Sequence, residues 1–441
     1  MNPEELPQGV RQNEVRQKLL ADARTKTWKG DINAHYTLAV IYSSGQGVAQ
    51  DYVEAARWYR KAAEGDHCQA QYDLAVCFEK GQGVAQDYRE AARWYRKAAE
   101  QNFAEAQYML GRCYDRGQGV AKNAAEAAKW YRKAAEQGHA KAQYMVGFCY
   151  AAGQGVAKDA AQAAAWYRKS AEQGNAEAQY NFGAMCLNGE GGPKNEEEAV
   201  KWWRRAAAQS VAEAQFNLGV CYDRGQGVEQ DEAQAAKWYR KAAYRNLAEA
   251  QFNLGRCYEK GQGVAQDYVE AAKWYREAAE QNLANAQYML GRCYDAGHGV
   301  KRDSVEAVQW YRRAAERDYA KAQYMLGVCH TMGQGVEKDD MEAAAWYRKA
   351  AEQGNAEAQY NYGMTCLSGV GVPRSETEAA KWWRRAGEQD FAEAQFNLGV
   401  CYDKGQGVPQ DHAEAAKWYQ RAAEGDHCKA QYDLGVCYEK G

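Results

Sequence analysis

The sequence predicts an all-α solenoid built from helix–turn–helix repeats of 36 residues. Three observations support this fold class. Tryptophan recurs every 36 residues, eleven times between Trp58 and Trp418. A loop with two glycines recurs with the same period, and the residues on both sides of it show helical spacing of apolar side chains. A fixed period of this length indicates a stacked array and not several independent domains.

The repeats follow one another without an insertion. Counted from an alanine at position 0, they begin at residues 34, 70, 106, 142, 178, 214, 250, 286, 322, 358, 394 and 430, which makes about eleven and a third repeats. We therefore predict an N-terminal tail and capping helix over residues 1–33, eleven complete repeats over residues 34–429, and the first helix of a truncated twelfth repeat over residues 430–441.

The two ends of the array differ. In the N-terminal tail, Val15, Leu19, Leu20 and Ala23 could form an apolar stripe that covers the first repeat. The last helix, which ends at Gly441, has no such cover. We therefore expect its apolar face to be exposed, so that either the parent chain continues beyond Gly441 or something covers that end, with end-to-end self-association as one such contact.

The first half of each repeat predicts one helix. In the repeat that starts at Ala106, apolar or small residues at positions 0, 4, 5, 7 and 8 fall on one helical face. Position 11 is glycine in all twelve repeats. Glycine suits the residue that follows a helix, because that residue commonly adopts a positive φ.

The second half of each repeat predicts another helix. Position 17 is Asp, Asn or Ser in all eleven complete repeats, and position 20 is Glu or Gln. This spacing predicts a capping box, in which two side chains satisfy free backbone N–H groups at the helix start. Ala127, Tyr131 and Ala134 then form an apolar stripe at positions 21, 25 and 28. Two helices cannot bury such stripes alone, so neighbouring repeats must stack.

The glycine-rich stretch GQGVAQDYVEAARWYRK (45–61) also resembles the beginning of a phosphate-binding loop. A phosphate-binding loop is a single site, whereas this loop occurs eleven times, and the chain contains no Gly-Lys-Ser/Thr sequence. We therefore predict that the loop is structural and that the protein uses no cofactor.

Charge and hydropathy argue against several classes of function. The net charge of −3 lacks the basic excess of a nucleic-acid-binding protein. No apolar run is long enough for membrane insertion, and the opening residues show no secretory signal. The sequence thus favours a cytoplasmic protein, with secretion by another route left open.

The thirteen cysteines predict neither disulfides nor a metal site. Nine occupy position 7, where equivalent residues of stacked repeats lie about 10 Å apart, beyond the reach of a disulfide. The chain has no Cys-x-x-Cys or His-Glu-x-x-His sequence, and its seven histidines are scattered over different positions. We expect the cysteines to be small buried residues in a reducing compartment.

The repeat Ala-x-Ala-x-x-x-Leu-Gly-x-x-Tyr-x-x-Gly-x-Gly-Val-x-x-Asp, followed by Ala-x-x-Trp-Tyr-x-x-Ala-Ala, closely resembles the Sel-one-like repeat (SLR) family over residues 34–441. That family is similar to tetratricopeptide repeats. The resemblance implies a right-handed superhelix that acts as an adaptor for other proteins. Packing positions of tetratricopeptide repeats match Leu110, Gly111, Tyr114, Ala127, Tyr131 and Ala134.

An enzyme is the least favoured class. A cysteine-rich branch of SLR proteins has been linked to β-lactam binding and hydrolysis, but its paired cysteines are absent from this sequence. Neither Ser-x-x-Lys nor Gly-x-Ser-x-Gly occurs. We predict no catalytic residues.

The sequence also has a longer period of five repeats. Residues 171–231 resemble residues 351–411, which lie five repeats further along the chain. Surface features should therefore occur twice. By the tetratricopeptide comparison, positions −1, 2, 6, 9 and 10 of the first helix line a concave groove. Most repeats carry charge there, but two pairs of repeats do not. The predicted partner-binding residues are Phe148, Ala151, Ala152, Ala184 and Leu187 in one pair, Val328, Thr331, Met332, Met364 and Leu367 in the other, and the flanking Arg112, Arg256 and Arg292.

Together these observations favour a non-enzymatic scaffold or adaptor that binds a partner protein or peptide along its groove. One alternative is a structural element of a larger assembly that uses its ends or its convex face. The other is a β-lactam-binding member of the family. The apolar groove residues have a simpler explanation too, which is packing against neighbouring helices.

Overall fold

The computed structural model describes residues 21–27 and 30–440, with the side chains of the last helix described as far as residue 435. Every regular element within these residues is helical, as the sequence predicts. By its contacts the chain divides into a first half, Met1–Cys221 with Gln226–Glu229, and a second half, Tyr222–Gly225 with Gln230–Gly441. Each half is described by itself.

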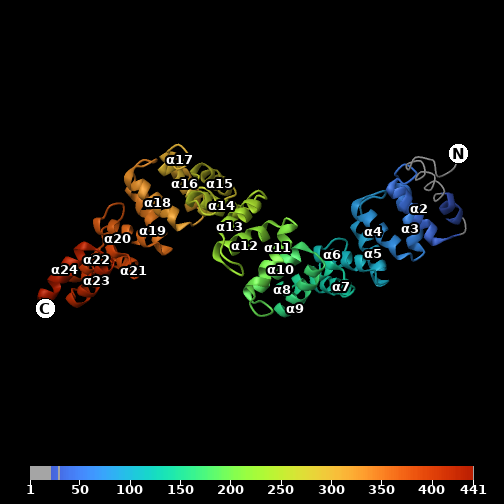
Figure 1. Cartoon of the computed structure of the whole chain (residues 1–441), viewed down its shortest axis with the longest axis horizontal. Coiled ribbons are helices and arrows are strands. Elements are labelled where there is room, and N and C mark those ends of the chain that lie inside the picture. The colour runs from blue at the N-terminus through green and yellow to red at the C-terminus, as the bar shows by residue number, and fades with distance from the viewer. Residues whose placement is uncertain (1–20, 28–29, 441) are drawn as a thin grey trace. The chain divides into compact units, whose positions relative to one another are not determined.

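In the first half the helices follow one another in chain order, and each contacts the next (Figure 1). Residues 21–27 form a short helix before them. The helices are α2 (Ile32–Ser44), α3 (Tyr52–Glu64), α4 (Cys68–Lys80), α5 (Tyr88–Glu100), α6 (Ala104–Arg116), α7 (Ala124–Glu136), α8 (Ala140–Ala152), α9 (Ala160–Glu172), α10 (Ala176–Asn188) and α11 (Glu196–Ala208). The boundary between the halves falls inside α12 (Ala212–Arg224).

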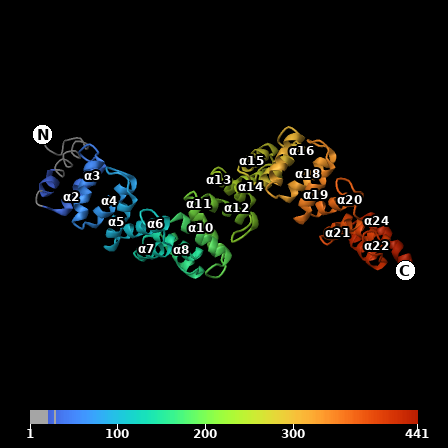
Figure 2. The same ribbon diagram turned by 180° about the vertical axis from the view of Figure 1, so that it is seen from behind.

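The second half repeats the same order of helices, which the view from behind shows as well (Figure 2). Its helices are α13 (Glu232–Ala243), α14 (Ala248–Lys260), α15 (Tyr268–Glu280), α16 (Ala284–Ala296), α17 (Ser304–Ala315), α18 (Ala320–Met332), α19 (Asp340–Glu352), α20 (Ala356–Ser368), α21 (Glu376–Gly387), α22 (Ala392–Lys404), α23 (His412–Glu424) and α24 (Cys428–Lys440). From α2 to α24 the even-numbered helices are the first helices of the repeats and the odd-numbered helices are the second.

A glycine at position 5 lets the two helices of a repeat approach closely. A Cβ atom on Gly111 would lie 2.6 Å from the Tyr131 ring, and one on Gly291 would lie 2.6 Å from the Tyr311 ring. Only glycine leaves room for the ring at this distance. The aromatic residue at position 25 is buried as predicted, with Tyr131 1% exposed.

The cysteines at position 7 are part of the same core. The members of this set with described side chains, from Cys77 to Cys401, are buried and form no disulfide. Burial raises the pKa of the Cys113 thiol to about 11, so this group stays protonated at neutral pH. The prediction of small, buried cysteines is confirmed for these residues. It was wrong for Cys428, which is exposed, and for Cys68 and Cys186, which are half-buried outside position 7. Cys437 lies outside the described side chains.

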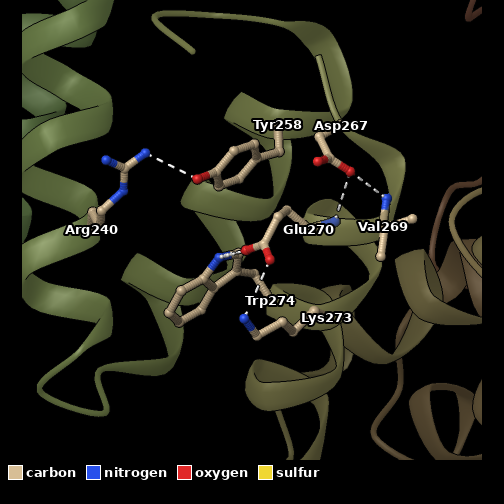
Figure 3. A network of polar contacts seen from close by, with 7 residues as sticks. All are labelled: Arg240, Tyr258, Asp267, Val269, Glu270, Lys273 and Trp274. Atoms are coloured by element: carbon tan, nitrogen blue, oxygen red, sulfur yellow. Dashed lines mark hydrogen bonds and ion pairs between the residues drawn. The ribbon is translucent and has the colours of Figure 1, made fainter. Parts of the chain in front are cut away.

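The predicted N-cap of each second helix is confirmed. Asp267 Oδ1 accepts hydrogen bonds from the backbone N–H groups of Val269 at 2.9 Å and of Glu270 at 3.1 Å (Figure 3). These bonds satisfy donors that have no partner inside the helix.

The reciprocal half of the capping box is not formed, and that part of the prediction was wrong. The Asp267 N–H donates to the carbonyl oxygen of Tyr258 at 2.9 Å, so it needs no side-chain acceptor. Glu270 instead pairs with Lys273 at 3.3 Å and accepts from the Trp274 indole N–H at 3.2 Å (Figure 3). The end of the first helix has taken over the role that the glutamate has in an isolated helix.

The second loop glycine joins neighbouring repeats. At Gly299 a Cβ atom would lie 1.8 Å from the carbonyl oxygen of Tyr268, which begins the second helix of the preceding repeat. Gly119 and Tyr88 make the equivalent contact in the first half. Because backbone touches backbone at these points, the recurring glycine is explained by stacking alone.

A buried glutamine at position 1 also joins neighbours. Gln107 is 1% exposed, its Nε2 donates to the carbonyl oxygen of Ala99 at 3.1 Å, and its Oε1 accepts from Gln137 Nε2 at 2.7 Å. The bond to Ala99 thus joins the end of one repeat to the beginning of the next, and the bond from Gln137 links the two ends of a single repeat. The residue equivalent to Gln137 in the second half, five repeats further on, is Arg317.

The predicted N-terminal cap can be followed at one residue. Ala23 lies in the helical segment 21–27, is 4% exposed and belongs to a buried cluster with Leu38 and Ile41. Val15, Leu19 and Leu20 lie outside the described residues. The division into a tail, eleven complete repeats and a truncated twelfth stays a prediction.

Candidate functional site

Two cavities lie on the surface that the first helices form. The first pocket has a volume of about 370 Å³ and the second about 440 Å³. Tyr72, Glu105, Tyr108, Met109, Arg112, His139, Ala140 and Lys141 line the first. Phe252, Arg256, Glu259, Lys260, Tyr288, Met289, Arg292, Tyr319 and Lys321 line the second. After a shift of five repeats, five residues of the first pocket match five of the second. Four of these pairs are identical, and the fifth is Tyr72 in the first pocket and Phe252 in the second. The two pockets are therefore copies of one site.

Three of the predicted partner-binding residues line these pockets. Arg112 lies in the first pocket, whereas Arg256 and Arg292 lie together in the second. Most pocket residues occupy the positions that the sequence assigns to the groove, which are −1, 2, 6, 9 and 10. Partner binding by the three arginines stays a prediction.

Aromatic rings form one wall of the first pocket. The rings of Tyr108 and His139 stack with centroids 4.8 Å apart, and the ring of Tyr72 lies 5.5 Å from that of Phe103. His139 Nδ1 accepts the backbone N–H of Ala142 at 3.1 Å and so caps α8. Burial lowers the pKa of His139, which favours the neutral imidazole that this acceptor role requires.

The second pocket has a different ring at the same place. Tyr319 replaces the histidine, and its ring centroid lies 5.4 Å from that of Tyr288. Tyr319 makes no side-chain cap for α18. Burial raises the pKa of both tyrosines, so both hydroxyls are neutral donors at physiological pH.

Within the described part of the chain, Arg112 and Arg292 contact only weak acceptors. Arg112 Nη1 lies 3.3 Å from the Met109 sulfur, and Arg292 Nη1 lies 4.0 Å from the Met289 sulfur. A thioether sulfur is a weak acceptor, whereas a guanidinium carries five N–H donors in a planar fork. Each fork therefore keeps donors for a ligand.

The predicted apolar residues lie beside the pockets and not in them. The first apolar zone consists of Phe148, Ala151, Ala152, Ala184 and Leu187, on α8 and α10. Phe148 is 39% exposed and Ala152 is exposed, whereas Ala151, Ala184 and Leu187 are half-buried.

The second apolar zone consists of Val328, Thr331, Met332, Met364 and Leu367, on α18 and α20. Met332 is 69% exposed and Met364 is 39% exposed. Val328 and Leu367 are half-buried against the core, and the Thr331 hydroxyl lies 3.1 Å from that of Tyr347. Packing therefore accounts for part of this zone, while both methionines remain accessible.

Helical spacing connects each pocket to its apolar zone. Lys141 and Phe148 are seven residues apart on α8, and Lys321 and Val328 are seven apart on α18. Seven residues are about two helical turns, so each pair lies on one face of its helix. A bound segment could contact the charged pocket and continue onto apolar side chains.

Several pocket residues were not anticipated. The groove positions were predicted, but the aromatic wall was not, although position 2 is Tyr or Phe in all twelve repeats. Met109 and Met289 lie at position 3, which helical geometry alone does not assign to the groove. The recurring Tyr or Phe at position 2, a position assigned to the groove, was the signal in the sequence that could have predicted the aromatic wall.

Other kinds of site find no support among the described residues. No group of three or more His, Cys, Asp or Glu side chains in this part of the chain could hold a metal ion. None of the described helices is long and apolar enough to cross a membrane.

Comparison with known proteins agrees with the fold. The sequence profile of the Sel1 repeat matches twelve consecutive stretches, which are residues 32–67, 68–103, 104–139, 140–175, 176–211, 212–247, 248–283, 284–319, 320–355, 356–391, 392–427 and 428–441. No curated protein gives a significant match.

Two solved structures are similar over much of the chain. One is a protective antigen present in uropathogenic Escherichia coli strains that displays an SLR fold; it is 36% identical, with a TM-score of 0.87, over 96% of this chain and 91% of its own. The other is a Sel1 repeat protein from Oxalobacter formigenes, 33% identical, with a TM-score of 0.58, over 70% of this chain and 89% of its own.

Proposed function

Since this chain belongs to the Sel1 repeat family, whose members are generally protein-interaction scaffolds, we propose that it binds a partner protein or peptide along the surface of its first helices. The observation that carries the proposal is the combination of pocket and apolar zone, found twice. Exposed apolar side chains beside a charged rim are typical of recognition surfaces. The proposed role needs no catalytic residue, cofactor or metal.

The main alternative is a structural element that makes its contacts through its ends or through the opposite face. A matched pair of methionines in one repeat separates the two. Met332 on α18 belongs to the second apolar zone and is 69% exposed, and Met341 on α19 is 73% exposed. The two side chains are almost equally exposed, but one lies on a first helix and the other on a second helix.

The experiment replaces either methionine by a photoreactive benzoylphenylalanine in the full chain. After irradiation in extracts of the native host, crosslinked partners are identified by mass spectrometry and then tested as purified proteins. We expect crosslinks from residue 332 and few from residue 341. Crosslinks from residue 341 alone would reject binding along the first helices.

A second test uses charge. Phe148→Glu and Met332→Glu place a carboxylate on exposed positions, so the fold should persist, as circular dichroism can verify. The identified partner should bind the double variant at least tenfold more weakly, as expected for a hot-spot residue worth more than about 1.4 kcal/mol. Unchanged affinity for a folded double variant would place binding elsewhere.

End-to-end association is a candidate with one observation of its own. Tyr432 on α24 is 74% exposed, whereas Tyr72 at the same position of α4 is half-buried. Sedimentation of the chain and of Tyr432→Glu tests it. A dimer that the substitution dissociates would support this contact, and a monomer at high concentration would reject it.

A further inference from the structure

The second pocket has an excess of positive charge that the protein leaves unpaired. Arg256, Lys260, Arg292 and Lys321 line it, with Glu259 as the one carboxylate. No ion pair within the described part of the chain involves any of these four cations. Glu259 is itself engaged, since its Oε2 accepts the Tyr275 hydroxyl at 2.6 Å.

Cations on the second helices behave differently. Lys273 pairs with Glu270 at 3.3 Å, and Arg348 pairs with Glu352 at 2.9 Å. These pairs follow the i,i+3 and i,i+4 spacing of an exposed helix.

Acidic residues do stand three positions from three of the pocket cations, namely Glu259, Asp295 and Asp318. Each of them accepts a hydrogen bond elsewhere: Glu259 from Tyr275, Asp295 from Gln334 at 2.6 Å and Asp318 from Gln323 at 3.5 Å. Since none of them forms an ion pair with a pocket cation in the described part of the chain, the charge of the pocket cations is directed to solvent or to a ligand.

The geometry of the arginines favours a carboxylate ligand. Arg256 and Arg292 lie on neighbouring first helices, α14 and α16, and line one cavity. A guanidinium binds a carboxylate through two parallel N–H···O bonds, which is stronger and more specific than a contact with a neutral acceptor. The Tyr288 and Tyr319 hydroxyls add neutral donors.

The apolar part of the pocket favours a peptide over a simple anion. Phe252, Tyr288 and Tyr319 present ring surface to a cavity of about 440 Å³. Rings of this kind bury the aliphatic stems of side chains and are the residues on which peptide interfaces concentrate their affinity. A small inorganic anion would leave this surface unused.

The first pocket provides an internal comparison, because it lacks most of this charge. Val76 stands where the second half has Arg256, and Glu105, which lines the first pocket, stands where the second half has Asn285. The first pocket thus has two cations, Arg112 and Lys141, beside one carboxylate. A carboxylate ligand would be repelled by Glu105.

We propose that the second pocket binds an acidic segment of the partner, with carboxylates on Arg256 and Arg292 and neighbouring apolar side chains on the aromatic wall, and that the first pocket does not select acidic segments. This inference rests on the proposed function and specifies the chemistry of its ligand. The two copies of the site then recognise different segments.

The test measures binding of short fluorescent peptides, blocked at both ends, to the full chain. One set carries glutamates between leucines and serines, and a matched set carries glutamine at every glutamate position. We expect the glutamate peptides to bind at least about tenfold more tightly, with an affinity that falls as salt rises. Equal affinity of the two sets would overturn the inference.

Variants locate the binding. Arg256→Val, which copies the first half, together with Arg292→Gln should weaken glutamate-peptide binding by about tenfold or more. The matched control is Lys273→Gln with Arg348→Gln, which removes the same charge from the second helices and should leave binding unchanged. Equal losses in the two double variants would indicate nonspecific attraction. Tighter binding of a single-stranded oligonucleotide at the same pocket would also overturn the choice of ligand.

The outcomes separate this inference from the proposed function. If Phe148→Glu and Met332→Glu release the identified partner while Arg256→Val and Arg292→Gln do not, the first helices bind the partner and the acidic-segment inference fails. If neither double variant affects the partner, both fail together.

Discussion

The first and second pockets occupy the same positions of repeats five apart, yet they present different charges. Tyr108, Met109, Arg112 and Lys141 recur as Tyr288, Met289, Arg292 and Lys321, so the framework of the site is copied. The copies differ at a few outward-facing residues, where neither the core nor the contact between repeats restricts the choice. The repeat pattern therefore determines where the pockets lie. The residues that differ between the two copies determine the charge that each pocket presents.

A second difference lies in the same two repeats. In the first half, Gln137 donates to Gln107 Oε1 and to Asn102 Oδ1. In the second half, Arg317 occupies the place of Gln137, and its side chain donates to Asn282 Oδ1 at 2.6 Å. The buried Gln287 Oε1 has no hydrogen-bond partner among the residues that the structure describes. The repeat that contains Gln287 and Arg317 thus lacks a polar contact that the equivalent repeat of the first half makes, although its bonds to the preceding repeat are present.

The contact that both halves share should respond equally in both, and with the largest effect. Gly119→Ala and Gly299→Ala each place a Cβ 1.8 Å from a backbone oxygen, at a φ of +74° or +72°. We expect a loss of at least about 3 kcal/mol in each half, from steric overlap added to left-handed strain. Local hydrogen exchange measures it, since repeat proteins need not unfold as one unit.

The control for this prediction is the other loop glycine. Gly117→Ala and Gly297→Ala have a similar φ but meet their nearest atoms at 3.3 Å. Their cost should be about 1–2 kcal/mol. If the two kinds of glycine proved equally sensitive, the contact between backbones would not be what requires the second glycine.

Exchanging the residues that differ should exchange the specificity of the pockets. Val76→Arg with Glu105→Asn converts the first pocket towards the second, and we expect it to gain glutamate-peptide binding by about tenfold. The assay is fluorescence anisotropy in the Arg256→Val background, so that the second pocket does not contribute. A gain from Val76→Arg that Glu105→Asn does not increase would remove Glu105 from the explanation.

Completing the polar contact should stabilise the second half. In Arg317→Gln, the new amide can donate to Gln287 Oε1 and to Asn282 Oδ1, as Gln137 does in the first half. We expect a gain of about 1 kcal/mol, and a loss of about the same size for Gln137→Arg. Hydrogen exchange of α16–α18 and of α6–α8 measures each change, and effects of equal sign in the two variants would contradict the argument.

The smallest expected effect depends on pH. Folding lowers the pKa of His139 from its ordinary value of about 6.5, because the ring is partly buried. The stabilisation from the neutral cap is therefore complete above about pH 6.5 and is lost as pH falls through the folded-state pKa. Tyr319, at the same place in the second half, has no such dependence.

The measurement compares α6–α8 with α16–α18 by hydrogen exchange at neutral and mildly acidic pH. His139→Asn should remove most of the acid sensitivity of α8, because Asn175 caps α10 at the same position without a titrating group. An acid sensitivity that survives in His139→Asn would trace to another group.

The fold followed from the sequence because its signals are local. Glycine at position 11 and Asp, Asn or Ser at position 17 mark helix ends wherever they occur, and stacking neighbours need only the period. The contact of Gln107 with Gln137 was not predicted, since a glutamine in a helix is usually an exposed residue and its partner lies thirty positions away. The sequence predicted that Glu270 would accept the backbone N–H of Asp267. This was wrong because the Tyr258 carbonyl oxygen, which belongs to another helix, accepts that N–H instead.

The site was predicted in part for a related reason. Helical geometry placed Arg112, Arg256 and Arg292 on the face of the first helices where the pockets lie. It could not show that Arg292 forms no ion pair with Asp295, three residues on, while Arg348 pairs with Glu352, since both spacings look favourable in the sequence. Nor could it show that Leu367 packs against the core while Met364 stays accessible. Such distinctions depend on distances between repeats.

The contact between the second loop glycine and the preceding repeat has a consequence for how such a gene can change. Gly119 meets Tyr88 and Gly299 meets Tyr268 at the same offset along the chain. A whole repeat added or lost by unequal recombination therefore recreates the contact at the new junction, whereas a fraction of a repeat destroys it. Length can thus vary in whole repeats without a new interface having to evolve. A pocket formed by three consecutive first helices is inherited intact only when its repeats are copied together, after which each copy is free to diverge.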